Sequence, residues 1–416
     1  MTLGLVVAVV VAAAAPPKSG PDTDLTARLG APARPVDASH GLVFGLRWRK
    51  PLVEMGFTRQ VGVSFGRPAI STRLGVLYVG TGDGKVQALR LRDGAAVWTH
   101  DHGVPFETDA SVVTVPAAPA APTPAAPEAE GPGKAPASLA GHDLVLVTAR
   151  DGILLALEAR TGALAWRSDV GGEVRAPAAV AGGTLLVTTA HNKLMALDIF
   201  TGKVLWSGGR PGSTKLTVLG HSAPVVDGDT VYATFSDGYV VAFALADGVQ
   251  RWLRPLSLRG GEFVDADADP IVKNGRLFVA SYSDGVYALN PADGQTLWFR
   301  AAPAVHSLAV HGADVIAGSG DGFVWGLRQA SGALVFRTKL DHGQVTRIES
   351  RDDLIVFAGG ESGLVVLDAR DGRPLQSTSF GAQMSGDLAW VGNELALVSS
   401  NGYLYSFARG HAGQVQ

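Results

Sequence analysis

A 22-residue pattern recurs along most of this 416-residue chain. Its first clear copy, "LYVGTGDGKVQALRLRDGAAVW" (77–98), has two runs of alternating apolar residues, a turn after each run and a closing tryptophan. The position of the first turn returns at Gly84, Gly152, Asn192, Gly238, Gly285, Gly322, Gly363 and Gly402, at intervals of 68, 40, 46, 47, 37, 41 and 39 residues. A period near 40 with several short strands per unit predicts a β-propeller that has one four-stranded blade per repeat.

The two ends of the chain share the last repeat. The eighth copy stops after its third strand, at Phe407, whereas "FGLRWRK" (Phe44–Lys50) carries Trp48 with no hairpin before it. Joining these segments in one blade would close the ring and leave no open sheet edge. We therefore expect an all-β fold over residues 40–410: an eight-bladed propeller of four-stranded antiparallel blades, closed by pairing of the N- and C-terminal segments. Seven blades are the alternative.

Each part of the repeat has an expected structural role. Asp-Gly and Asn-Gly at the first turn predict two-residue type I′ turns, which require positive φ values. A large side chain on the fourth strand is expected to pack between neighbouring blades, at Trp98, Trp166, Trp206, Trp252, Trp298, Phe336 and Leu375. Proline precedes several first strands, at Pro68, Pro177, Pro224 and Pro270. Since proline donates no ladder hydrogen bond, these strands should be the inner edges that line the central channel.

Composition and motif checks exclude several classes of function. The formal net charge of −3 gives no basic surface for nucleic acid, and the absence of cysteine excludes disulfides and thiolate metal sites. "DADAD" (265–269) begins like a calcium loop, but it lacks the glycine and the final glutamate. "GVSFG" (62–66) has no helix pattern after it, and "HDH" (100–102) sits where an exposed loop is expected. We predict no catalytic, cofactor-binding or metal-binding residues.

Two segments stand outside the repeat. Leu3–Ala15 is an apolar run of 13 residues that ends in small residues, although no Lys or Arg precedes it. It is too short to cross a bilayer, so residues 1–18 are expected to be a signal peptide for export. A Pro/Ala-rich tract over 116–140 is expected to be a disordered insertion between the first and second strands of the second blade.

Across residues 44–407 the repeat resembles the quinoprotein-like (PQQ-type) propeller motif. One group of such proteins is the quinoprotein dehydrogenases. In these enzymes the quinone lies over Ca²⁺ and stacks between a tryptophan and a disulfide of adjacent cysteines. This chain has no cysteine, and only Trp325 and Trp390 lie outside the expected docking positions. A quinone-dependent enzyme therefore remains an alternative hypothesis.

Two further segments resemble the BamB family, which assists the machinery that inserts β-barrel proteins into the bacterial outer membrane. "LTVLGHSAP" (216–224) is similar to the family's "LSLRGESAP", and "DADADP" (265–270) is similar to its "DVDTTP". In that family these segments contact a periplasmic POTRA domain of the barrel-forming subunit. The resemblance places the contacts on Leu216, Val218, Leu219, Asp265 and Asp267. Leu219 stands where the family has arginine, and Arg254 and Arg259 lie nearby in sequence.

The resemblance implies a non-catalytic scaffold in the periplasm that needs no cofactor. The family is normally lipid-anchored through a cysteine, so this chain is expected to reach the outer membrane through its partner. It is expected to be a monomer outside the complex and to have no transmembrane span. Unfolded outer-membrane clients are possible further partners, guided by sheet edges or by the channel mouth. A propeller that binds another envelope protein is a third hypothesis.

Overall fold

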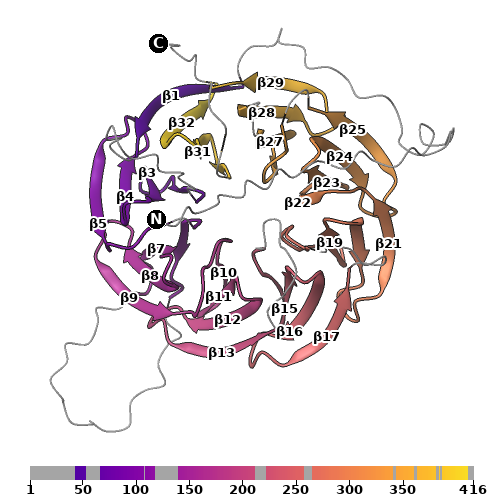
Figure 1. The fold of residues 1–416 in the computed structure, drawn as a ribbon, viewed down its shortest axis with the longest axis horizontal. Coiled ribbons are helices and arrows are strands. Elements are labelled where there is room, and N and C mark those ends of the chain that lie inside the picture. Colours follow the sequence, from indigo (N-terminus) through magenta and orange to yellow (C-terminus); the bar gives the residue numbers. More distant parts are fainter. Residues whose placement is uncertain are drawn as a thin grey trace, which may run out of the picture.

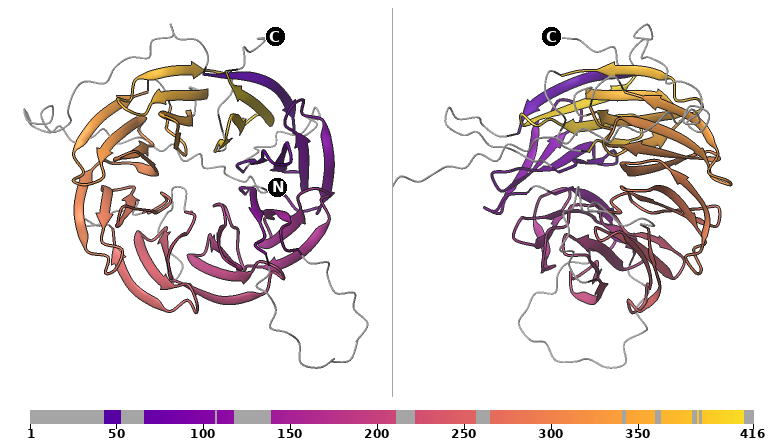
Figure 2. Two further views of the ribbon diagram at one scale, coloured as in Figure 1. Left: turned by 180° about the vertical axis from the view of Figure 1, so that it is seen from behind. Right: turned by 45° about the vertical axis from the view of Figure 1, so that its right-hand side comes forward.

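The computed structural model describes residues 43–52, 66–106, 108–117, 139–210, 222–256, 265–340, 343–359, 363–380, 384 and 387–410. In this part of the chain all regular structure is β-strand, arranged in eight four-stranded antiparallel sheets. The sheets stand as blades around one axis and form a closed ring (Figure 1; Figure 2). The prediction of an eight-bladed propeller is therefore confirmed. No helix in the described part of the chain could span a bilayer.

The strands run from the axis outward in each blade. Blade 1 comprises β2 (Ala69–Ser71), β3 (Val76–Gly80), β4 (Lys85–Arg90) and β5 (Ala96–Asp101), and blade 2 comprises β6 (Ser111–Thr114), β7 (Asp143–Thr148), β8 (Ile153–Glu158) and β9 (Leu164–Asp169). Blade 3 comprises β10 (Ala179–Ala181), β11 (Thr184–Thr189), β12 (Lys193–Asp198) and β13 (Val204–Gly209), and blade 4 comprises β14 (Val225–Asp227), β15 (Thr230–Phe235), β16 (Tyr239–Ala244) and β17 (Gln250–Pro255).

The second half of the ring repeats this order. Blade 5 comprises β18 (Ile271–Lys273), β19 (Arg276–Ser281), β20 (Gly285–Leu289) and β21 (Thr296–Ala301), and blade 6 comprises β22 (Val305–His311), β23 (Asp314–Ser319), β24 (Phe323–Arg328) and β25 (Leu334–Lys339). Blade 7 comprises β26 (Glu349–Arg351), β27 (Leu354–Gly359), β28 (Gly363–Asp368) and β29 (Pro374–Thr378), and blade 8 comprises β30 (Ala389–Val391), β31 (Glu394–Val398), β32 (Tyr403–Arg409) and β1 (Phe44–Pro51).

Blade 8 closes the ring. β1 pairs antiparallel with β32, from Phe44 opposite Arg409 to Pro51 opposite Tyr403. In Figure 1 the indigo β1 completes the yellow C-terminal blade. The expected sharing of one blade by the two ends of the chain is confirmed.

The hydrophobic core lies between blades. The second and third strands are covered on both faces, and one cluster joins Tyr78 of blade 1 to Val145 and Leu155 of blade 2. The outer strands alternate instead: in β13, Leu205 is 52% exposed, whereas Trp206 is partly buried. Each blade is therefore stable only against its neighbours, as expected for a repeat fold.

The tryptophans pack between neighbouring blades, as predicted; each such inter-blade contact is called a seam. Trp98 of blade 1 donates a hydrogen bond from Nε1 to the carbonyl oxygen of Ala159 in blade 2, at 3.0 Å. Its ring also covers Gly162, where an added Cβ would lie 2.5 Å from the ring. The same two contacts occur at Trp48, Trp166, Trp206, Trp252 and Trp298. At these six positions the glycine of the second turn is therefore required by the indole of the preceding blade.

The last two seams use other side chains. Phe336 packs against Gly372, as predicted. Leu375 is partly buried against the cluster that joins blades 7 and 8, but Gln376 stands in register opposite Val366, at the position that tryptophan has in other blades. Gln376 Oε1 accepts the N–H groups of both Val43 and Phe44 at 2.8 Å. A polar staple thus replaces the aromatic contact where blade 7 meets β1.

The predicted type I′ turns were also wrong. At the first turn of blade 1 only Gly84 has a positive φ, of 87°, and its N–H donates to the Thr81 carbonyl at 3.1 Å. This geometry is a type I turn followed by a left-handed residue, the usual solution for a longer hairpin loop. Asn192, with a φ of 57°, takes the same place in blade 3.

Candidate partner-binding face and axial charge cluster

The antiparallel order gives the ring two distinct faces. The hairpins that join the second strand to the third open on the same face as the connections between blades; this is the connection face. The other two hairpins of each blade open on the opposite face. β13 ends and β14 begins on the connection face. In the same way, β17 ends and β18 begins on this face. The segments that link these strands contain Leu216, Val218, Leu219 and Arg259, which lie outside the described residues.

The two predicted aspartates are described, and both are buried. Asp265 is fully buried and Asp267 is 6% exposed, just ahead of β18. The carbonyl oxygen of Asp265 accepts the N–H of Tyr282 at 2.8 Å, which ties this segment to blade 5. Their carboxylates therefore do not lie on the accessible surface. Arg254 donates to Thr296 Oγ1 at 2.9 Å and so is held against blade 5.

Asp269, the third aspartate of the same run, belongs to a set that the repeat places around the axis. The residue two positions before an inner strand is charged in five blades, at Arg67, Asp109, Asp269, Arg347 and Asp387. Because the inner strands line the centre of the ring (Figure 1), these residues stand at one level of the channel. We call this set the axial ring.

The aspartates of the axial ring staple one blade to the next. Asp109 Oδ1 accepts the N–H of Arg67 at 2.8 Å, and Asp269 Oδ1 accepts the N–H of Ala223 at 2.7 Å. Asp387 Oδ1 accepts the N–H of Arg347 at 3.2 Å. In each case the donor occupies the equivalent position in the preceding blade. These carboxylates therefore have a structural role at the entry of their inner strands.

Arg347 gathers the same carboxylates across the channel. Its guanidinium group forms an ion pair with Asp269 and lies 3.7 Å from oxygens of Asp109 and Asp387. Arg67 forms an ion pair with Glu349 of β26. The axial charge cluster thus consists of Arg67, Asp109, Asp269, Arg347, Glu349 and Asp387. It connects blades 1, 2, 5, 7 and 8, and its two cations face four carboxylates.

The environment of this cluster shifts two pKa values. Burial and the neighbouring Asp387 carboxylate raise the pKa of Asp109 to about 6, although Arg347 and Arg67 oppose the shift. Burial and the nearby Arg67 lower the pKa of Arg347 from its usual value. The excess of carboxylates therefore makes Asp109 the group that takes up a proton as the pH falls.

We expect this shift to make stability depend on pH. Because the pKa of Asp109 is higher in the folded state than in the unfolded chain, its contribution favours folding at pH 5 and weakens as the pH rises through 6. In Asp109→Asn the free energy of unfolding should change less between pH 5 and pH 7.5 than in the unmodified protein. Urea unfolding of both proteins at both pH values measures the change. Identical pH profiles would show that Asp109 is not the group responsible.

The axial charge cluster does not resemble a site for a quinone over Ca²⁺. Its aspartates already accept backbone N–H groups, and Arg347 occupies the space between them. Within the described residues no three His, Cys, Asp or Glu side chains are grouped so that they could hold a metal ion. His102 Nε2 lies 3.9 Å from Asp151 Oδ2, which makes a pair and not a metal site.

The sequence contained a signal for the axial ring that motif reading missed. Its members stand at a fixed offset before the inner strand, as in the pairs Arg67-Pro68 and Asp269-Pro270. If the repeats are aligned on the inner strand instead of on the hairpin, the charged residues fall at the same position of each repeat. Their convergence on Arg347 follows only from closure of the ring.

Comparison with known proteins agrees with this architecture. Residues 82–338 match the family described as outer membrane protein assembly factor BamB. The assembly factor BamB of Moranella endobia is 24% identical over 260 residues, which cover 61% of this chain and 67% of that protein.

Solved structures share the fold. The crystal structure of BamB from Moraxella catarrhalis superposes with a TM-score of 0.68 at 18% identity, over 88% of this chain and all of that one. A quinohemoprotein alcohol dehydrogenase from Pseudomonas putida gives a TM-score of 0.64 at 12% identity, over 94% of this chain and 79% of that one. Such likenesses show the fold alone. The family match covers more than half of the chain, and the protein therefore belongs to the family of the outer membrane protein assembly factor BamB.

Proposed function

We propose that this protein is a non-catalytic scaffold in outer-membrane protein assembly, and that its connection face docks on the periplasmic POTRA domains of the barrel-forming subunit. The observation that carries the proposal is the family match over residues 82–338. This range spans the whole of blades 2–5 and therefore includes both segments that resemble the family's partner contacts. It follows that the protein works in the periplasm, next to the outer membrane.

Because the two aspartates are buried, we assign different roles to the aspartates and to the apolar residues of this face. We assign direct contact with the partner to the apolar residues Leu216, Val218 and Leu219. Asp265 and Asp267, which are nearly inaccessible, would act from beneath by fixing the start of blade 5. The binding energy of an interface is usually concentrated in a few well-packed residues.

A binding measurement with the host's own POTRA domains tests the proposal. In the double variant Leu216→Ser/Val218→Ser we expect the loss of at least about 2 kcal/mol of binding free energy, roughly thirtyfold in Kd. Calorimetry or surface plasmon resonance measures the Kd. Leu205→Ser is the matched control, because Leu205 is an exposed apolar residue on the outer strand of blade 3.

The outcomes of this experiment test the assembly role and the assignment of the contact residues separately. No binding by the unmodified protein would refute the assembly role and favour another envelope partner. Equal binding by the double variant and the control would refute the assignment of the contacts. Asp265→Asn/Asp267→Asn should lower stability and binding together; weaker binding at unchanged stability would instead assign these side chains a direct contact.

A further inference from the structure

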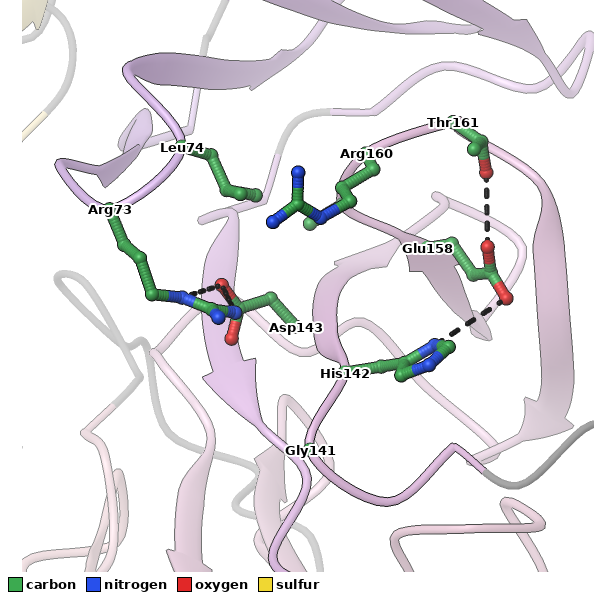
Figure 3. Close-up of a pocket in the computed structure, with 9 residues that line it drawn as sticks. Arg73, Leu74, Gly141, His142, Asp143, Glu158, Arg160 and Thr161 are labelled. Carbon is green, nitrogen blue, oxygen red and sulfur yellow. Dashed lines mark hydrogen bonds and ion pairs between the residues drawn. The ribbon is translucent and has the colours of Figure 1, made fainter.

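A cavity of about 190 Å³ opens on the opposite face, between blades 1 and 2 (Figure 3). Its walls are the β2–β3 turn at Arg73 and Leu74, the residues 141–143 where the long β6–β7 connection enters β7, and the β8–β9 turn at 158–161. The volume is below the range usual for cofactors and drug-sized ligands. It is large enough for a group the size of one amino-acid side chain.

The carboxylates around this cavity already have partners. Asp143 Oδ2 accepts a hydrogen bond from Arg73 Nε at 3.1 Å, and its Oδ1 accepts one from Thr114 Oγ1 at 2.7 Å. Glu158 Oε2 accepts from Thr161 Oγ1 at 3.2 Å, and its Oε1 lies 3.9 Å from His142 Nδ1. Both carboxylates are therefore already engaged by side chains of this protein.

Arg160 also lines this cavity, but unlike the carboxylates it is not engaged by a described side chain. Arg160 is an exposed residue, and Figure 3 shows its guanidinium group beside Leu74, directed away from Glu158. Its side chain has no hydrogen bond or ion pair with any residue that the structure describes. A guanidinium group carries five N–H donors in a planar arrangement that matches a carboxylate. The unused hydrogen-bonding capacity of the cavity is therefore that of a cation.

The repeat supplies an internal comparison for this residue. Arg160 stands second-to-last before the glycine of the second turn, and the same position holds Arg92 in blade 1 and Arg370 in blade 7. Arg92 pairs with Asp93, and Arg370 donates to both oxygens of Asp368. In blade 3 the position is Phe200, which packs near Gly183. Of these three arginines, Arg160 is the one that lines the cavity described above.

We propose that this cavity is a binding site for a small carboxylate group, held by the guanidinium of Arg160 and flanked by Leu74 and the Thr161 turn. Charge-assisted, two-pronged contacts of this kind are the strong form of carboxylate recognition. The carboxylate can belong to a free small molecule or to an acidic side chain of a peptide. The site lies on the face opposite the proposed docking segments, so it can exist whether or not that docking occurs.

Methyl NMR of the full chain tests the site through Leu74, whose side chain lines the cavity. The probe is N-acetyl-glutamate N-methylamide at pH 7, and its glutamine counterpart is the uncharged control. We expect a saturable shift of the Leu74 methyl signals by the glutamate probe, with a Kd on the order of millimolar, and none by the glutamine probe. A pentapeptide amide with a central glutamate distinguishes the two sources: equal affinity assigns a peptide side chain, and weaker affinity assigns a free small molecule.

Three variants make the result specific. Arg160→Ala should weaken binding at least about tenfold, while Arg370→Ala, at the matched position in blade 7, should leave it unchanged. Glu158→Gln should strengthen binding, because it removes a like charge from the cavity wall. The proposal is overturned if Arg160→Ala binds the probe as well as the unmodified protein does. It is equally overturned if the glutamine probe gives the same shift, or if no probe saturates.

Discussion

Replacing Arg347 by alanine is expected to lower the free energy of unfolding by about 3–5 kcal/mol, because it leaves several carboxylates close together without their shared cation. Asp109, Asp269 and Asp387 all approach this guanidinium group. The side chain of Arg347 is only 20% exposed. The remaining negative charges would repel one another across the axis. Urea unfolding followed by tryptophan fluorescence at pH 7.5 measures the loss.

The matched control for this change is Arg370→Ala. Arg370 also pairs with an aspartate, Asp368, but its side chain is 68% exposed on the opposite face of blade 7. Exposed ion pairs contribute little, so the unfolding midpoint should hardly move. Equal effects of the two substitutions would mean that the axial charge cluster is no more important than a surface pair. The loss in Arg347→Ala should also shrink at pH 5, where protonated Asp109 no longer needs a cation.

Truncation of Trp166 to alanine is expected to cost about 3–5 kcal/mol of stability, as large-to-small changes of buried aromatic side chains do. The side chain is 7% exposed at the seam between blades 2 and 3. The substitution removes the ring that covers Gly202 and the hydrogen bond from Nε1 to the Ile199 carbonyl, at 2.9 Å. Thermal or urea unfolding measures the loss.

A double-mutant cycle with Gly202 checks the mechanism of this effect. A Cβ at Gly202 would lie 2.4 Å from the Trp166 ring, and the φ of 70° disfavours any side chain there. Gly202→Ala should therefore destabilise the protein strongly by itself, but less in the Trp166→Ala background, where the clash is gone. Strictly additive losses would show that the ring and the glycine do not act as one contact.

Most of the fold could be predicted from the sequence because its determinants are local. The spacing between the hairpin glycine and the closing tryptophan is fixed by one hairpin and one strand, so it repeats wherever a blade repeats. The differences from the expectation concern single-residue geometry. Leu375 does pack between blades 7 and 8, but the register position of the tryptophan belongs to Gln376. At the first turn only one φ is positive, and not the two that a type I′ turn requires.

The candidate site was less accessible to sequence reasoning, because it depends on contacts between distant repeats. The family resemblance placed partner contacts on Asp265 and Asp267, yet both are buried, and Asp269 faces the axis. Asp109 and Arg347 come from blades 2 and 7 and meet only because the ring closes. No sequence pattern distinguishes Arg160, and its difference from Arg370 appears only when the contacts of the two side chains are compared.

The shared eighth blade has a consequence for how the chain folds. Most strand pairs join neighbours in sequence, so they can form early and quickly. The pairing of β1 with β32 instead requires two segments from opposite ends of the chain to meet, and loop-closure entropy opposes this until the intervening blades are in place. Until then the outward edge of β32 and both edges of β1 stay unpaired and open to other chains. Closure of the ring should therefore be the late, slow step of folding, and the period before it is when the chain is most prone to aggregate.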